Sequence, residues 1–193
     1  MESVLALDTR LFLFFNGLHV DWLDPVMAFV SSEFGWTPLY LFLAYLAIKK
    51  YGIRSVWFFL GVALLFISTD QLSAHFFKPY FHRFRPCHNE EIADLVYLPY
   101  GHCGGKYGFI SSHACNVFGL AMFASYHLKS YWKYMPCALF GWAVLIGYSR
   151  LYMGVHYPGD VICGAIVGLL LGFVATKIFM KNTAKPKEKC SKT

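Results

Sequence analysis

Three clusters of polar residues in this chain carry groups that can hold and transfer a phosphate. In chain order they are Lys78 with Arg85-Pro86, Ser111-Ser112-His113, and Ser149-Arg150 with His156 and Asp160. Together they supply three cations, two histidines, one carboxylate and a pair of serines. Cationic donors bind phosphoryl oxygens, and a histidine beside a carboxylate can act as a nucleophile. These residue types therefore suit the displacement of an ester oxygen from phosphate.

The first cluster provides cations. Arg85 offers a planar guanidinium that can bind two phosphate oxygens at once, and Lys78 adds a compact positive charge. The alternative is a basic loop that flanks a membrane segment and contacts lipid head groups. The spacing of these two residues alone does not separate the two interpretations.

The second cluster stands at the start of an apolar run. Ser111 and Ser112 precede that run as helix-capping residues do, and a helix N-terminus presents free N–H groups and a positive dipole end to an anion. His113 would then lie in the first turn, where it could donate a proton to a leaving oxygen. The alternative is ordinary capping beside one interfacial histidine.

The third cluster pairs a histidine with a carboxylate. Pro158-Gly159 lies between them, so we expect a helix to begin near Pro158 and to carry Asp160 in its first turn. A carboxylate that is hydrogen-bonded to one nitrogen of His156 fixes the tautomer and makes the other nitrogen more nucleophilic. Alternatively, Asp160 only complements the helix dipole, and Arg150 only extends its charged end to the membrane surface.

The elements that must position these clusters are apolar helices. The 193 residues are 57% hydrophobic and only 15% charged, whereas soluble domains carry about 25% charged residues. Segments suited to crossing a bilayer, which takes roughly 20 residues, are expected at about 36–49, 54–75, 112–128, 134–151 and 159–180. The sequence therefore predicts an all-α integral-membrane helical bundle of five to six transmembrane helices, rather than a very apolar soluble bundle.

The N-terminal residues 1–35 leave the sixth span open. This aromatic-rich stretch is interrupted at Asn16-Gly17 and resumes as a helix at Asp24-Pro25. It is either a first short span or a helix in the membrane interface, and its acidic residues favour the interface. We expect one membrane domain over residues 1–181, followed by a disordered basic tail over 182–193.

Basic residues predict the orientation of the bundle. They follow alternate spans at Lys49, Lys50, Arg54, Lys129, Lys133 and the lysine-rich tail. The positive-inside rule makes that side cytoplasmic and puts the three polar clusters on the outer face. Because the basic residues form no single stripe, the net charge of +6 indicates membrane topology rather than a nucleic-acid partner. Acidic residues precede the first basic one, which does not fit a cleavable signal peptide.

The combined clusters resemble the signature of the type 2 phosphatidic acid phosphatase superfamily, which reads Lys-x6-Arg-Pro, Pro-Ser-Gly-His and Ser-Arg-x5-His-x3-Asp. The first and third motifs match at Lys78–Pro86 and Ser149–Asp160. The second motif departs, because Ile110 replaces the proline and Ser112 replaces the glycine, so we expect a slightly shifted loop there. The resemblance covers about residues 36–180, and the chain length is similar to that of small bacterial members.

The resemblance implies a role for each matched residue. His156 would attack phosphorus to form a phosphohistidine, Asp160 would orient it, and His113 would protonate the leaving oxygen and then activate water. The phosphoryl oxygens would be held by Lys78, Arg85, Ser111, Ser112 and Arg150. No metal or other cofactor is implied, because these cations offset the charge that phosphoryl transfer spreads over the oxygens.

Four further residues are expected near the site. Asn116 lies one turn after His113, and Asp70 lies near the outer end of its span. Both are expected to support the site or to line a substrate groove, with a plain interhelical hydrogen bond as the alternative. Cys87 and Cys103 share the outer loop, and in an oxidising compartment we predict a disulfide between them. The remaining histidines lack the spacing of zinc ligands.

The sequence thus predicts an integral-membrane lipid phosphatase of a bacterial inner membrane, with the bilayer as its partner and an active site on the periplasmic side. The substrate is open among polyprenyl diphosphate, lipid A phosphate, phosphatidylglycerol phosphate and phosphatidate. A lipid phosphotransferase with the same site is an alternative. The apolar spans argue against a soluble vanadate-dependent haloperoxidase, and the His–Asp pair argues against an anion channel, because an ion filter needs no nucleophile.

Overall fold

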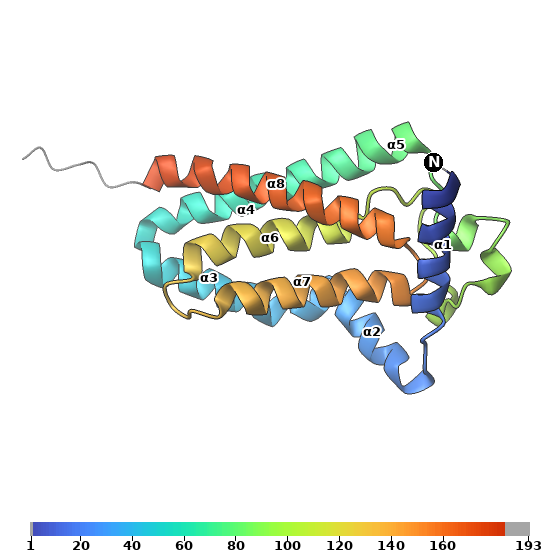
Figure 1. The fold of residues 1–193 in the computed structure, drawn as a ribbon. Coiled ribbons are helices and arrows are strands. Elements are labelled where there is room, and N and C mark those ends of the chain that lie inside the picture. The colour runs from blue at the N-terminus through green and yellow to red at the C-terminus, as the bar shows by residue number, and fades with distance from the viewer. Residues whose placement is uncertain (1, 184–193) are drawn as a thin grey trace, which may run out of the picture.

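Long helices form from the apolar segments in the computed structural model, which describes residues 2–183 (Figure 1). They are α3 (Thr37–Tyr51), α4 (Ser55–Asp70), α6 (Ser112–Leu128), α7 (Met135–Tyr152) and α8 (Pro158–Thr183). Within residues 2–183, the strand-like pairing is one isolated antiparallel bridge between Phe84 and Tyr107. The all-α prediction is confirmed, and each long helix begins at or next to its predicted start. The disordered basic tail was expected over residues 182–193; α8 instead continues to Thr183, and the rest of that tail lies outside the described residues.

The second predicted span is longer than expected. Helix α4 continues without a break through a π-helical segment (Gln71–Phe77) into α5 (Lys78–Phe81). A π-helical stretch of this length is rare and often marks a functional site. Here it ends at Lys78, the first cation of the predicted phosphate site.

Prolines mark where several of the helices begin. Pro25, Pro38 and Pro136 each lie in the first turn of a helix, and α8 starts with Pro158 itself. Proline fits these positions because the N–H that it lacks would have no partner inside the helix. The start of α8 near Pro158, with Asp160 in the first turn, is as predicted.

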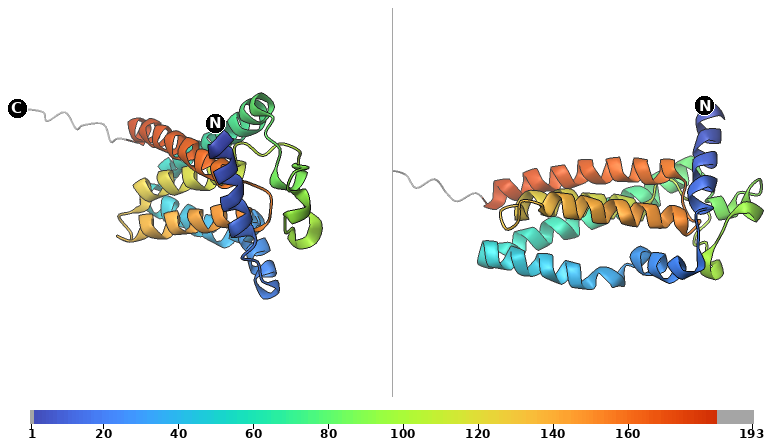
Figure 2. Two further views of the ribbon diagram at one scale, coloured as in Figure 1. Left: turned by 45° about the vertical axis from the view of Figure 1, so that its right-hand side comes forward. Right: turned by 60° about the horizontal axis from the view of Figure 1, so that its bottom comes forward.

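The two N-terminal helices, α1 (Glu2–Asn16) and α2 (Asp24–Ser31), lie at one end of the bundle. Figures 1 and 2 show α1 crossing that end, whereas the five long helices run along the bundle axis. The Asn16 side-chain amide donates to the carbonyls of Leu151 and Tyr152 at 3.2 and 2.9 Å, which fixes the end of α1 to the end of α7.

Helices α6 and α8 pack backbone to backbone. Gly164, Gly168 and Gly172 of α8 face α6, and a Cβ added at any of them would lie under 3.0 Å from a carbonyl oxygen of α6 or its cap. Small residues spaced by four allow this approach in membrane helices. The Ser111 N–H also donates to the Asp160 carbonyl at 3.0 Å. The close packing therefore brings the starts of both helices together.

The outward faces of the bundle are apolar. Large exposed side chains on α3, α4 and α8 include Leu41, Phe42, Leu60, Leu64, Ile67, Ile162, Ile166, Leu170 and Phe173. Two helical stretches, Phe34–Phe81 and Pro158–Met180, have the length and apolar composition to cross a membrane. Soluble monomers rarely expose such continuous apolar surface, whereas lipid contact accounts for it.

The two ends of the bundle differ in chemistry. The α3–α4 and α6–α7 connections lie at one end, together with Lys49 and Lys50 in the last turn of α3 and with Lys129 and Lys133 after α6. The opposite end carries α1, the long loop 82–111 and the α7–α8 turn (Figure 1). All three polar clusters belong to this second end, so the topology brings them together as the sequence predicted.

We predict that Gly168→Ala destabilises the bundle, because the added Cβ collides with backbone atoms of Cys115 that cannot rotate away. Overpacking of this kind costs about 1–3 kcal/mol of unfolding free energy. Gly141→Ala on α7 is the matched control, since nothing lies within 4 Å of a Cβ there. Thermal unfolding in detergent should show a lower midpoint for Gly168→Ala alone. Equal midpoints for both variants would contradict the close α6–α8 contact.

Candidate active site

A cavity opens where the three polar clusters meet. Its volume is about 470 Å³, and its polar lining includes residues of the three clusters, namely Lys78, Arg85, Ser112, His113, Arg150 and His156. The remaining wall is mainly apolar and aromatic, with Val30, Trp36, Tyr40, Phe66, Val117, Leu120, Trp142 and Ile146. The cavity therefore combines a cationic region with an apolar one, and α2, α3, α4, α5, α6, α7 and the long loop all contribute residues to it.

The His156–Asp160 pair lies in the turn between α7 and α8. Both residues are buried, and His156 Nδ1 lies 3.4 Å from Asp160 Oδ2. The same carboxylate oxygen accepts the Tyr157 N–H at 3.0 Å, which fixes its direction. Because Nδ1 faces a carboxylate, the proton resides on Nδ1, and the lone pair of Nε2 is left to accept a hydrogen bond. His156 Nε2 lies on the side of Arg85, 3.4 Å from its Nη1.

The protonation state of His156 follows from its surroundings. Burial, and then the positive charges of Arg85 and Arg150, hold the pKa of His156 well below its ordinary value of 6.5. The imidazole is therefore neutral at pH 7. A neutral imidazole with an unprotonated Nε2 is the form that can attack phosphorus.

The start of α6 provides the second histidine. Ser111 is the N-cap, and its Oγ accepts the Ala114 N–H at 3.4 Å. Ser111 is fully buried and does not line the cavity, whereas Ser112 and His113 do. His113 Nε2 lies 3.6 Å from a carboxylate oxygen of Glu33. The structure thus gives Ser111 a capping contact and leaves Ser112 facing the cationic region.

Lys78 contacts the serine that departs from the family motif. Its Nζ donates to Ser112 Oγ at 3.0 Å, and Ser73 Oγ lies 2.8 Å from the same hydroxyl. Ser73 belongs to the π-helical segment, whose wide turn presents Ser73 and Lys78 to the start of α6. The hydroxyl of Ser112 is therefore held by Ser73 and Lys78, which belong to the helix that α4 and α5 form with the π-helical segment.

Two arginines complete the cationic region. Arg85 Nη1 donates to the Val155 carbonyl at 3.3 Å, and Arg150 Nη1 donates to Ser31 Oγ. The Nε atoms of both arginines are buried without a hydrogen-bond partner among the described residues. Buried donors of this kind are costly when unpaired. An anion bound in the cavity could accept hydrogen bonds from these two Nε–H groups.

Asp70 and Asn116 form a polar contact across the cavity wall. Asn116 Nδ2 donates to Asp70 Oδ1 at 3.1 Å, and its Oδ1 accepts from Thr69. Asp70 and Asn116 both line the cavity. The contact is the interhelical hydrogen bond that the sequence left as an alternative, and its position also fits the expected supporting role.

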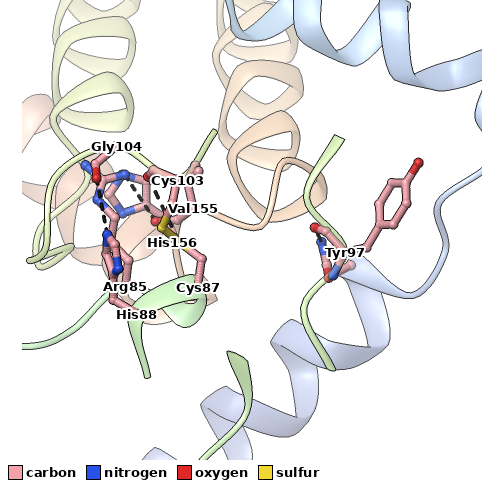
Figure 3. Close-up of a disulfide and its surroundings, with 9 residues drawn as sticks. Arg85, Cys87, His88, Tyr97, Cys103, Gly104, Val155 and His156 are labelled. Carbon is pink, nitrogen blue, oxygen red and sulfur yellow. Dashed lines mark hydrogen bonds between the residues drawn. A yellow bond between two sulfur atoms is a disulfide. The ribbon is translucent and has the colours of Figure 1, made fainter. Parts of the chain in front are cut away.

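The long loop carries a disulfide. Cys87 and Cys103 are bonded, with their Cα atoms 6.0 Å apart, and Figure 3 shows the bridge beside Arg85 and His156. The Arg85 N–H donates to the Lys106 carbonyl at 3.1 Å, so the two arms of the loop are paired next to the bridge. His88 lies close to both sulfurs. Bonded sulfurs are not thiolates, so this group is a poor metal site.

Three residues in contact with the site were not assigned from the sequence. Arg83 forms an ion pair with Asp160 at 2.7 Å, and Asp8 forms one with Arg83 at 2.6 Å. A Cβ on Gly108 would lie 3.1 Å from Asp160 Oδ2 and 3.2 Å from Arg85 Cγ, so a larger residue there would require these side chains to shift slightly. For Arg83, the sequence offered one signal: in an extended segment, residues 83 and 85 face the same side, so Arg83 could have been placed near Arg85.

Comparisons with known proteins agree with this geometry. Residues 55–184 match the profile of the PAP2 superfamily. The chain is 37% identical over 187 residues to a lipid A 4'-phosphatase of Bacteroides thetaiotaomicron, covering 96% of this chain and 82% of that protein. It is 36% identical over 181 residues to a lipid A 4'-phosphatase of Porphyromonas gingivalis, covering 93% and 76%. Its fold resembles a transmembrane PAP2-type phosphatidylglycerolphosphate phosphatase of Bacillus subtilis, with a TM-score of 0.71 at 24% identity and coverage of 96% and 90%.

Proposed function

The chain belongs to the PAP2 superfamily, and we propose that it is a membrane phosphatase that releases phosphate from a membrane lipid. The observation that supports this most directly is the cavity, in which a cationic wall adjoins an apolar one. A lipid phosphate has the same two parts, a dianionic head and an apolar body. The curated relatives are themselves named as lipid phosphatases.

The chemistry follows from the positions of two histidines. His156 Nε2 attacks phosphorus, the bond from phosphorus to the ester oxygen breaks, and His113 gives its proton to that oxygen. A phosphohistidine results. Water, deprotonated by His113, then attacks the same phosphorus and releases phosphate and His156.

The cations stabilise the charge that moves during both steps. Lys78, Arg85 and Arg150 surround the cavity next to His156, and Ser112 adds a hydroxyl. Such preorganised donors lower the free energy of the transition state, because they need not reorient when charge develops on the phosphoryl oxygens. This arrangement is the reason to propose a reaction that needs no metal.

We further propose that the lipid is a lipid A phosphate, cleaved at the 4' position. Two relatives named as lipid A 4'-phosphatases align with nearly the whole chain. The cavity also carries carboxylates at Glu33 and Asp70, next to its cations. Carboxylates suit a head group rich in hydroxyls, because they accept hydrogen bonds from them.

The proposed membrane placement has five spans. They are α3, α4 with α5, α6, α7 and α8, while α1 and α2 lie in the outer interface. Helix α2 has eight residues, so it measures about 12 Å and cannot cross a bilayer. Lysines at the end of α3 and between α6 and α7 support a cytoplasmic location for the end of the bundle opposite the active site. The active site would then face the periplasm of a bacterial inner membrane.

Purified protein in detergent should release phosphate from lipid A, and mass spectrometry should locate the loss at the 4' position. Phosphatidylglycerol phosphate, undecaprenyl diphosphate and phosphatidate form the comparison panel, and lipid A should give the highest kcat/KM.

A chelator should leave the rate of phosphate release unchanged, and His113→Ala should lose activity because it lacks the proton donor. If no lipid in the panel loses phosphate, the proposed function is wrong. Transfer of phosphate to another acceptor would identify a phosphotransferase instead.

Orientation can be measured with single added cysteines in a variant in which the cysteines outside the disulfide, Cys115, Cys137, Cys163 and Cys190, are replaced. In sealed cells, a membrane-impermeant maleimide should label Asp21→Cys, at the end of the bundle with the active site. It should label Lys133→Cys, in the α6–α7 connection, only after the membrane is opened. The opposite pattern would put the active site in the cytoplasm.

A further inference from the structure

We propose that Arg83 and Asp8 are positioning residues, which hold the carboxylate of Asp160 and thereby set the orientation of His156. The inference rests on the proposed role of His156 as the nucleophile. Neither residue lines the cavity, so neither is expected to touch the substrate. Both act on the His156–Asp160 pair from the side that does not face the cavity.

The guanidinium of Arg83 joins two carboxylates. Its Nη1 donates to Asp160 Oδ1 at 2.7 Å, and its Nη2 donates to Asp8 Oδ2 at 2.6 Å. The other oxygen of Asp160 accepts the Tyr157 N–H and faces His156. Both oxygens of Asp160 therefore have fixed partners, and the carboxylate cannot rotate without breaking an ion pair.

Asp8 also holds the backbone of the catalytic turn. Its Oδ1 accepts the Gly159 N–H at 2.7 Å, and a Cβ on Gly159 would lie 2.8 Å from Asp8 Oδ2. The Arg83 guanidinium in turn lies 4.1 Å from the centre of the Tyr157 ring. Asp8 and Arg83 thus hold both the side chain of Asp160 and the turn that carries His156.

The position of α1 explains how Asp8 reaches this turn. Asp8, Phe12 and Asn16 are spaced by four and share one face of the helix. Phe12 is buried with its ring 5.4 Å from that of Tyr157, and Asn16 is bonded to the end of α7. Away from this face, Leu7, Leu11 and Phe14 are exposed. Helix α1, which crosses the end of the bundle in Figure 1, covers the catalytic turn.

Arg83 and Arg85 carry the same charge but serve different anions: Arg83 pairs with Asp160, whereas Arg85 faces the cavity. Asp160 is fully buried, and a buried carboxylate needs a cationic partner to stay ionised. If Arg85 were that partner, it would be withdrawn from the phosphate. Arg83 supplies the positive charge from the side of α1, which leaves Arg85 free to face the cavity.

The test compares Arg83→Gln, Arg83→Lys and Asp8→Asn, with Arg10→Gln on the exposed part of α1 as the matched control. We expect Arg83→Gln to lower kcat by about 10- to 100-fold, as is typical when an outer partner of an active-site ligand is lost. KM should stay unchanged, and Arg83→Lys should restore most of the rate. Asp8→Asn should lower kcat less, and should add nothing when combined with Arg83→Gln. Arg10→Gln should behave as wild type.

A spectroscopic measurement separates positioning from general stability. The ring ¹⁵N shifts of His156 should report the Nδ1–H tautomer in the wild type and a mixture of tautomers in Arg83→Gln. Unchanged ¹⁵N shifts, or a loss of rate explained entirely by a smaller folded fraction, would overturn the proposal. The rates should be measured with p-nitrophenyl phosphate as well as the lipid. If the wild type cleaves no lipid, the proposed function fails, while the ¹⁵N shifts still decide the role of Arg83.

Discussion

The close contact between α6 and α8 is the constraint on which the active site depends. Three glycines of α8 lie against carbonyl oxygens of α6 and its cap. The Ser111 N–H then reaches the carbonyl of Asp160. Two helix N-termini meet at this point, each with the positive end of its helix dipole. His113 from one and the His156–Asp160 turn before the other are thereby brought to the same cavity.

A second constraint is the balance of charge around that cavity. Lys78, Arg85 and Arg150 line it, whereas the carboxylate of Asp160 is already paired with Arg83. The cationic wall therefore keeps an excess of positive charge with buried donors that have no partner. Such an arrangement is costly in a protein interior unless an anion is bound. The phosphate of the substrate is the group that would complete it.

Much of this structure could be predicted from the sequence. The long helices were predicted from apolar segments of sufficient length, and several of their first residues were predicted from prolines and serines. Basic residues after alternate helices predicted that the three clusters share one end of the bundle. Their motifs then identified the histidines and the cations. These features depend on local composition and short spacing, which a single sequence displays directly.

Other features depend on tertiary contacts that no local pattern reveals. Asp8 is 152 positions from Asp160, and its contact with Arg83 exists only because α1 crosses the end of the bundle. The π-helical segment before Lys78 has no distinct composition, so its extension of the second span was missed. The burial of Ser111, away from the cavity, also follows from tertiary packing, whereas its capping contact with the Ala114 N–H was predicted from the sequence.

The account rests most heavily on His156 as the nucleophile, and trapping of the phosphoenzyme tests this directly. A ³²P-labelled substrate is mixed with protein, and the reaction is quenched in alkali, in which phosphohistidine survives. The wild type should carry label that acid removes, and peptide mapping should locate it on His156. His156→Ala should carry none, whereas His113→Ala should still be labelled by a substrate with a good leaving group. Full turnover by His156→Ala, or label on another residue, would contradict the mechanism.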